Sequence, residues 1–299
     1  PSARSAGMGD AYVALADDAD ATFFNPAALA NDEGRSLSTT FYKPVPSLAS
    51  DIFTSFGAYT QSFGGVGNFG LSLVYTSLGT QFRTDEQGQD LGTFTSFGVA
   101  FGVSYGAYIT KSLSLGLTTK LIHQNLAGQG AGAEQGSGTG TSFGADLGLL
   151  WKPSDRFTLG WALRNVGPNM TFIDADQSDP LPQTFTIGFG WTFLKIEKWS
   201  FLLATDVYKP LSDKGISSFI SGWSDGTASE ELKDMDYHVG GEWAYELSEF
   251  TSFALRAGYS HDQDGNRKTP TFGFGLKYDW ATFDLSYFAN GGTAVKNVF

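Results

Sequence analysis

The sequence predicts an all-β transmembrane protein, an antiparallel outer-membrane β-barrel of about 14 strands with an N-terminal hatch or plug. Three observations favour this fold. Most of the chain alternates apolar residues with small or polar ones, each alternating segment is about long enough to cross a bilayer, and short connections alternate with long ones. Each of these patterns is what a closed sheet in a membrane requires.

The composition permits a membrane barrel and argues against other classes. Aromatic residues make up 15% of the 299 residues and charged residues 17%. No stretch reaches the roughly 20 apolar residues of a membrane helix, but a spanning strand needs only about ten residues, half of them apolar. The net charge of -12 argues against binding to nucleic acid. We take the chain as mature or trimmed, because it shows no secretory signal.

The period-two alternation is clearest near the C-terminal end. In 271–280, aromatic or apolar residues occupy the even positions, and most of the odd positions hold Gly, Lys or Asp. The same pattern predicts 13 strands, at 36–43, 52–61, 67–78, 94–109, 112–124, 141–152, 156–165, 183–194, 199–208, 236–246, 250–260, 270–280 and 281–289.

The apolar faces of these segments carry no charged residue in their middle parts. A basic residue on the lipid face at the bilayer midplane costs about 2–4 kcal/mol, so the pattern fits contact with lipid. A soluble β-sandwich also alternates, but its core is aliphatic and its outer faces are rich in Lys and Glu. Here Phe, Trp and Tyr dominate one face and Gly the other, which favours the barrel.

The lengths of the connections predict the topology. Short links at 60–68, 109–112, 152–156, 194–199, 245–250 and 279–282 alternate with longer ones. Outer-membrane barrels have short periplasmic turns and long extracellular loops, so the N-terminus is expected in the periplasm. Barrels of this kind have even strand numbers, so we expect residues 290–299 to lead into a final strand that is incomplete in this sequence. The barrel then spans residues 36–299.

Residues 1–30 do not alternate, and residues 1–35 are expected to form a periplasmic or lumenal hatch. They read as short helical pieces with a forced break at Asn25-Pro26, where Asn25 can cap the turn that Pro26 starts. A disordered tail is the alternative, but the Ala and Phe content of the segment favours packing. A segment that precedes a barrel on its periplasmic side is well placed to enter the lumen.

This segment also carries a resemblance to a known family. Ala3-Arg4, Gly7-Met8-Gly9 and the following Ala-Tyr-Val-Ala run, with Asn25-Pro26-Ala27 after it, resemble the start of mature PorV/PorQ-family proteins, which are related to FadL-type channels. The resemblance implies a hatch motif made of Gly7, Met8, Gly9, Asn25, Pro26 and Ala27. It also implies a non-enzymatic component of type IX protein secretion that binds the secretion pore or the signal domains of cargo.

Two other functions stay open. A FadL-like channel for uptake of hydrophobic molecules predicts an apolar pocket between hatch and wall, lined by Phe23 and Phe24. A structural barrel that anchors a surface layer or filament predicts a partner on the outer loops. The expected partners are outer-membrane lipid or lipopolysaccharide and secretion-system proteins or secreted cargo, with the longest loop, 209–235, as the first candidate contact.

Charged residues on the faces opposite the apolar ones are expected to line the lumen. They can form a salt-bridge network that holds plug and barrel together, or they can set ion or substrate selectivity. These residues are Lys120, Asp146, Arg164, Asp206, Glu242, Arg256, Lys277 and Asp284.

Motifs for catalysis or metal binding are weak, and we expect no catalytic residue, cofactor or metal. Gly140–Gly144 matches G-x-S-x-G, but Ser142 begins a strand instead of a strand-to-helix turn, and His123, His238 and His261 lie on separate strands or loops. Asp262, Asp264 and Asn266 mimic the start of a calcium loop that lacks its later ligand. Weak divalent binding by Asp174, Asp176 and Asp179 is the alternative to a solvated acidic loop.

Overall fold

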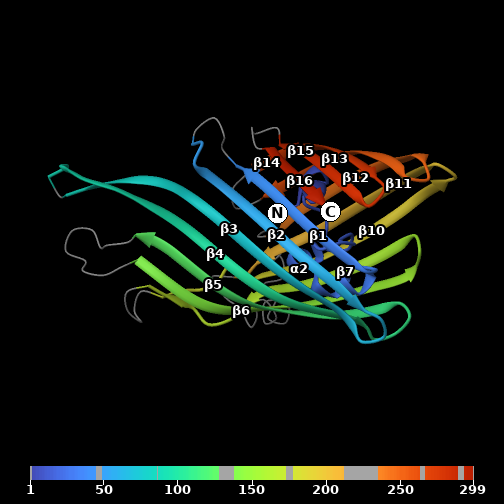
Figure 1. Cartoon of the computed structure of the whole chain (residues 1–299), viewed down its shortest axis with the longest axis horizontal. Helices are drawn as coiled ribbons and strands as arrows, with labels where there is room; N and C mark the ends of the chain where they lie inside the picture. Colours follow the sequence, from blue (N-terminus) through green and yellow to red (C-terminus); the bar gives the residue numbers. More distant parts are fainter. Residues whose placement is uncertain are drawn as a thin grey trace, which may run out of the picture.

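The computed structural model describes most of the chain, and its ranges are 2–44, 49–85, 87–127, 138–172, 178–211, 235–262, 267–288 and 293–298. The described elements are almost all antiparallel strands (Figure 1). None of the described helices is long and apolar enough to cross a membrane.

Among the described residues, fourteen strands follow one another in a single ring of antiparallel pairings. Each strand pairs with its neighbours in the ring, and β1 pairs with β16, so that the first and last strands close the sheet. The strands are β1 (Arg35–Lys43), β2 (Ile52–Phe63), β3 (Gly67–Thr84), β4 (Asp90–Tyr108), β5 (Leu113–Ala127), β6 (Gly138–Ser154), β7 (Phe157–Val166), β10 (Thr184–Ile196), β11 (Trp199–Pro210), β12 (Asp236–Ser248), β13 (Thr251–Asp262), β14 (Arg267–Tyr278), β15 (Ala281–Phe288) and β16 (Thr293–Val298).

All 13 segments predicted from the alternation contain a strand, and β16 lies within the segment expected to lead into a further one. A separate two-stranded piece, β8 (Met170–Thr171) with β9 (Ser178–Asp179), was not predicted. We call the end of the barrel with the tight links the short-turn end and the opposite end the long-connection end. Both Arg35 and Val298 lie toward the short-turn end.

The predicted long connection at 78–94 is wrong in one respect. The structure continues β3 to Thr84 and starts β4 at Asp90, so a two-stranded ribbon replaces most of the loop. Figure 1 shows this ribbon projecting beyond the long-connection end of the barrel. The alternation is lost there because lipid no longer demands an apolar face, although the strands continue to pair.

The two faces of the sheet differ as the alternation predicts. Large apolar side chains on the outer face are exposed in the isolated chain, for example Leu71, Leu73, Phe101 and Val103. The inner face carries buried small and polar residues, such as Ser104 and Thr118 on adjacent strands. An apolar exterior around a polar interior is the arrangement of a membrane barrel.

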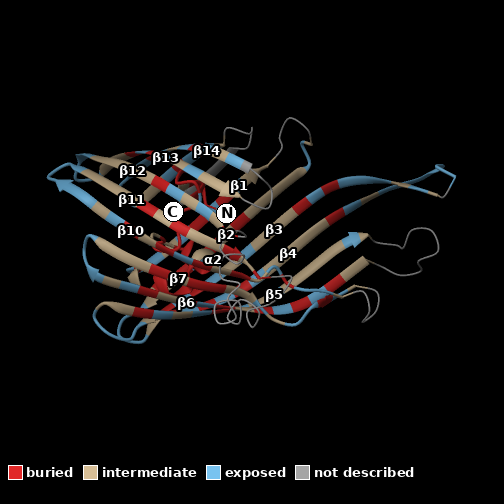
Figure 2. Ribbon diagram, turned by 180° about the vertical axis from the view of Figure 1, so that it is seen from behind, coloured by how far each residue is buried: buried red, intermediate tan, exposed pale blue. Residues whose placement is uncertain are grey.

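The N-terminal segment, residues 2–34, lies among the strands and is largely buried (Figures 1 and 2). It contains α1 (Ala3–Gly7), α2 (Ala21–Phe24) and the 3-10 helix η1 (Pro26–Asn31). α1 contacts β13 to β16, whereas η1 contacts β3 to β6 on the other side of the ring. The segment therefore spans the interior from one wall to the other.

Candidate functional site

Hydrogen bonds and ion pairs join the N-terminal segment to the inner wall at several places. At the Asn25-Pro26 break, the Asn25 side chain accepts a hydrogen bond from the Ala27 amide at 3.1 Å, and Pro26 is the first residue of η1. The Asn25 amide group donates to the carbonyl oxygens of Val13 at 2.9 Å and of Leu149 on β6 at 3.2 Å. Asn25 thus caps a helix, folds the segment on itself and joins it to the wall.

A chain of ion pairs joins α1 to the wall. The Arg4 guanidinium donates to both carboxylate oxygens of Glu242 on β12, each at 3.0 Å, and to Asp17 at 2.9 Å. Arg256 on β13 donates to Glu242 and to Asp284 on β15, both at 2.6 Å. Burial lowers the pKa of Arg4, but the carboxylates of Asp17 and Glu242 outweigh this effect and hold the pKa above its ordinary value. Arg4 is therefore a permanent cation in this chain.

Asp206 on β11 holds the middle of the segment. Its Oδ2 accepts hydrogen bonds from the main-chain amides of Tyr12 at 2.7 Å and Val13 at 2.8 Å. On the neighbouring strand, Nδ1 of His238 donates to the carbonyl oxygen of Gly9 at 2.7 Å. Because these contacts reach the backbone of the segment, they fix its path independently of most of its side chains.

The far side of the segment is held by hydroxyl and amide groups. The Ser38 hydroxyl on β1 donates to Asp20 at 2.6 Å. Asp32 accepts from Ser36 and from Thr60, and the Asn68 amide on β3 donates to the Asp32 carbonyl oxygen at 2.6 Å. Burial raises the pKa of the Asp32 carboxyl above its ordinary value, although the two hydroxyl donors act against it.

Inward glycines let the segment come into backbone contact with the wall. A Cβ placed on Gly116 would lie 2.1 Å from the carbonyl carbon of Pro26, and one on Gly258 would lie 2.2 Å from the Gly9 amide nitrogen. These distances are far shorter than van der Waals contact. Five further strand glycines face backbone atoms of the segment in the same way, namely Gly106, Gly148, Gly160, Gly240 and Gly273, whereas Gly70 and Gly190 face the side chains of Thr22 and Leu15. The Gly-rich inner face therefore fits the N-terminal segment closely.

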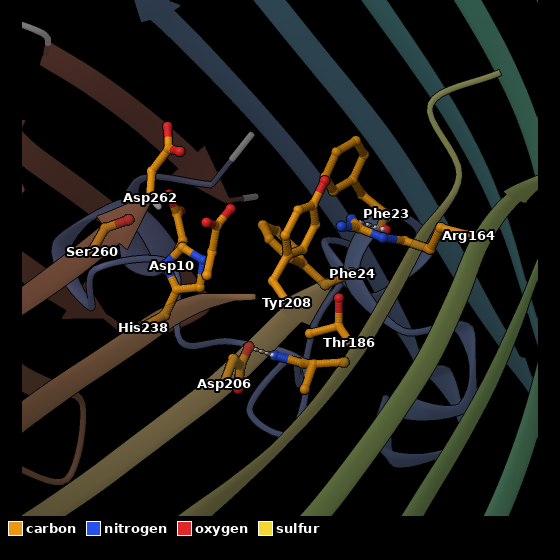
Figure 3. A pocket seen from close by; sticks show the side chains of 12 residues that line it. Asp10, Phe23, Phe24, Arg164, Thr186, Asp206, Tyr208, His238, Ser260 and Asp262 are labelled. Atoms are coloured by element: carbon orange, nitrogen blue, oxygen red, sulfur yellow. Dashed lines mark hydrogen bonds between the residues drawn. The ribbon is translucent and has the colours of Figure 1, made fainter. Parts of the chain in front are cut away.

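Two cavities adjoin the segment. One, of about 370 Å³, lies toward the long-connection end, and its lining includes Phe23, Phe24 and Arg164 (Figure 3). The other, of about 320 Å³, is lined by Arg4, the residues of the ion-pair chain and side chains from the short-turn ends of β12 to β15. In the described part of the chain, the segment lies between these two spaces.

The structure brings together most of the lumenal residues that the sequence singled out. Glu242, Arg256 and Asp284 form the ion-pair chain, and Asp206 holds the backbone of the segment. Arg164 donates to the carbonyl oxygen of Phe23 at 3.3 Å and lies 5.2 Å from the centre of its ring.

Three other predicted lumenal residues do not contact the segment in this way. Lys120 on β5 pairs with Asp146 on β6 at 2.7 Å, and Asp146 also accepts from the Asn165 amide, so this pair belongs to the wall. Lys277 is exposed on the wall of the short-turn cavity.

In the predicted hatch motif, Gly7 and Gly9 meet the wall. Met8 is fully buried with Ala11 and Ala204, and Pro26 and Ala27 lie against inward glycines.

The motifs considered for catalysis and metal binding have structural partners or fall outside the described residues. Ser142 donates to the carbonyl oxygen of Pro168 at 2.8 Å, and His123 makes its hydrogen bond with Thr141. Asp264, Asn266, Asp174, Asp176 and most of loop 209–235 lie outside the described residues. No three His, Cys, Asp or Glu side chains of the described ranges are grouped to hold a metal ion.

Sequence reasoning missed the residues of the segment that complete these contacts. Asp17, Asp20 and Asp32 read only as polar positions in a helical stretch, and His238 read as an isolated residue near a strand end. One signal was available: an inner face rich in Gly predicts that another backbone lies against it.

Comparison with known proteins agrees with this architecture. The family model described as type IX secretion system protein PorV matches residues 1–212. A search of curated proteins finds no match.

The solved structures that resemble the chain include two toluene transporters and a FadL homologue. The toluene transporter TodX of Pseudomonas putida is 13% identical, with a TM-score of 0.60 over 100% of this chain and 96% of that one. The toluene transporter TbuX of Ralstonia pickettii is 16% identical, with a TM-score of 0.61 over 98% and 95%. A Pseudomonas aeruginosa FadL homologue is 13% identical, with a TM-score of 0.53 over 99% and 96%.

These structural likenesses show that the chain shares the β-barrel fold of these proteins, and the family match covers more than half of the sequence. Together with the resemblance of its first 30 residues, they identify the chain as a member of the PorV family of type IX secretion system proteins.

Proposed function

We propose that this chain acts in type IX protein secretion as a closed outer-membrane barrel that binds protein partners on its outer surface, either the secretion pore or the signal domains of cargo. The observation that supports this proposal is the occupied lumen. Arg4, Asn25 and the backbone at Tyr12 and Val13 all bond to the wall, and glycines fit the wall to the segment. A lumen filled by protein and polar contacts favours partner binding over passage of substrate.

In this proposal the N-terminal segment is a hatch and enters from the periplasm. The short links gather at the end where β1 begins, and such links face the periplasm in outer-membrane barrels. The long connections and the β3–β4 ribbon then face outward, where they meet exported proteins.

The ribbon is our candidate contact surface among the described residues. Beyond Leu78 on β3 and Phe97 on β4, the two strands pair only with each other in the described part of the chain. Their outer edges therefore present main-chain groups that a partner's strand can pair with. The ribbon also carries Phe82, whose side chain is 78% exposed, and Leu91. An extended partner segment that pairs with an edge and covers Phe82 fits this surface.

Purification of the tagged chain from its native membranes, followed by mass spectrometry, tests the proposal. We expect secretion-pore or surface-attachment proteins to co-purify, and Phe82→Asp to reduce their recovery at least about tenfold. Val66→Asp is the matched control, because Val66 is 63% exposed at the short-turn end. Repeated absence of secretion proteins would refute the secretion role, whereas equal recovery with both variants would refute only the ribbon contact.

One observation favours the second candidate, a channel for hydrophobic molecules. Phe23 and Phe24 do line a cavity between segment and wall, as that function predicts. The same cavity is also lined by Asp10, Asp206 and Asp236, so it is not the purely apolar pocket expected for a hydrocarbon. Uptake of a labelled hydrocarbon by cells with and without the protein distinguishes the two candidates.

A further inference from the structure

The inner wall holds a lysine amine, a carboxylate and an asparagine amide in mutual contact. β5, β6 and β7 lie side by side in the ring (Figure 1). Nζ of Lys120 on β5 lies 2.7 Å from Oδ1 of Asp146 on β6, and the same Nζ donates to the amide oxygen of Asn165 on β7. The contact therefore spans three consecutive strands.

The Asn165 side chain is held in one orientation. Its main-chain amide donates to Oδ1 of Asp146 at 2.7 Å, and its Nδ2 donates to the carbonyl oxygen of Pro182 at 2.7 Å. Its φ of 59° lies in the left-handed region, and the register of β7 against β6 is irregular here. Irregularities of this kind re-aim a side chain. In this case the amide carbonyl is turned toward the lysine.

The path from Lys120 to Asn165 crosses a glycine. The residue opposite Lys120 on β6 is Gly144, so no β6 side chain stands between the two. A Cβ built on Gly144 would lie 3.5 Å from Cδ1 of Leu181 and 3.8 Å from Cα of Asn165. Leu181 is buried, and the Asp146 side chain is only 1% exposed. The lysine therefore meets its two partners under apolar cover.

These three groups are the ones that an amide-forming reaction between lysine and asparagine requires. The amine is the nucleophile, the amide carbon is the electrophile, and an adjacent carboxylate can carry protons between them. Groups that a fold holds in contact react as if at very high concentration, with effective molarities of about 10⁵–10⁸ M. A salt bridge alone needs only Lys120 and Asp146, and it does not explain why the Asn165 carbonyl is held against the same nitrogen.

We propose that the folded chain joins Lys120 to Asn165 by an isopeptide bond, with Asp146 as the proton carrier. Asp146 takes a proton from the Nζ ammonium, the freed electron pair forms the Nζ–Cγ bond, and Asp146 passes the proton to Oδ1. Nδ2 then receives two protons, one from Nζ and one from that oxygen. The Cγ–Nδ2 bond breaks with its electron pair on nitrogen, ammonium leaves, and the Cγ–Oδ1 double bond re-forms. No further reactant is needed.

The bond would reinforce the wall where strand pairing stops. The described residues of β6 and β7 pair no further than Ala145 with Val166, although β6 continues to Gly138. A covalent link from β5 to β7 beside that last pair keeps this end of the ladder from opening. This inference goes beyond the secretion role and does not depend on it.

Intact-mass measurement of the full chain tests the proposal. The chain purified from inclusion bodies in urea should have the mass of its sequence. After folding into detergent micelles it should be lighter by about 17 Da, the mass of the ammonia that is lost. When the folded chain is denatured again and digested, trypsin should not cut after Lys120, and fragmentation should show two peptides joined at Lys120 and Asn165.

Variants assign the roles. Lys120→Arg keeps a cation beside Asp146 but has no amine to form the bond, so it should keep its full mass after folding. Asp146→Asn should slow the loss of mass at least about 100-fold, because it cannot carry the proton. The matched control is Lys277→Arg, an exposed lysine on β14, which should lose ammonia as the unmodified chain does. Heat-modifiable migration on a gel shows which variants have folded.

The proposal is overturned if the folded, unmodified chain keeps its full mass, because the three groups then form hydrogen bonds only. This result needs no variant to fold. It is also overturned if Lys120→Arg loses the same mass, which would indicate that an asparagine has cyclised to a succinimide, or if the joined peptides do not contain Lys120 and Asn165. None of these outcomes bears on the secretion role, which the co-purification experiment tests separately.

Discussion

Replacement of Gly116 by alanine should loosen the N-terminal segment while leaving the barrel intact. The new Cβ would lie 2.1 Å from the carbonyl carbon of Pro26 and 2.3 Å from the amide nitrogen of Ala27, and both are backbone atoms that no side-chain rotation can move away. Overpacking of this kind costs about 1–3 kcal/mol. If the N-terminal segment relieves the clash by moving away from the inner wall, the population of this detached state rises about 5- to 150-fold.

Hydrogen exchange read by mass spectrometry measures this population. Amides of η1 should exchange faster in Gly116→Ala by that factor, whereas amides of the barrel strands far from η1 should not change. The matched control is Gly57→Ala on β2. Gly57 is also a strand glycine, but a Cβ added there would meet no atom within 4 Å.

The comparison removes the general effect of replacing a strand glycine, because alanine restricts the unfolded chain equally in both variants. Equal exchange of η1 in the two variants, with both barrels folded, would show that the inward glycines are not shaped to the segment. The explanation of the Gly-rich face would then be wrong.

Three further predictions concern the polar contacts. Asp206→Ala removes the acceptor of two main-chain amides. The variant should weaken the attachment of the N-terminal segment to the wall by about 3–6 kcal/mol, measured as faster hydrogen exchange of those amides. Glu242→Gln leaves two buried guanidinium groups with weaker partners and should lower barrel stability by about 3 kcal/mol in a denaturant titration, whereas Lys277→Gln, outside the ion-pair chain, should have little effect. Burial raises the pKa of Asp32, so its protonation stabilises the seated segment below the ordinary pKa of about 4, and this stabilisation is lost as pH rises through the higher pKa of the folded state. Asp32→Asn should abolish that pH dependence, which is measured by hydrogen exchange after correction for the intrinsic exchange rate at each pH. A variant with the same pH profile as the unmodified protein would contradict this explanation.

The strands could be predicted because contact with lipid requires an apolar side chain at every second position, whatever the neighbouring strands are. The apolar positions of 271–280 therefore locate β14 without knowledge of its neighbours. The limits of β3 and β4 could not be predicted, because the ribbon beyond Leu78 has left the region where lipid imposes a pattern. The two strands still pair there, but main-chain pairing does not require apolar and polar residues to alternate.

In the candidate site, too, local contacts could be predicted from the sequence and long-range contacts could not. The cap at Asn25-Pro26 is local, so adjacent residues are enough to predict it. The pairing of Arg4 with Glu242 joins opposite ends of the sequence, and no local pattern identifies which inward acid meets which residue of the segment. The sequence indicated that Glu242 and Arg256 face the lumen, but the pairing of Glu242 with Arg4 depends on how the segment turns inside the ring.

The seam between β1 and β16 has a consequence for how the protein is made. β1 directly follows the N-terminal segment and pairs with β16, so it is synthesised well before the strand with which it pairs. The ion pair of Arg4 with Glu242 requires β12, and it cannot form until that strand is in place. Closure of the ring and formation of the Arg4–Glu242 ion pair therefore both depend on strands that follow β11 in the chain.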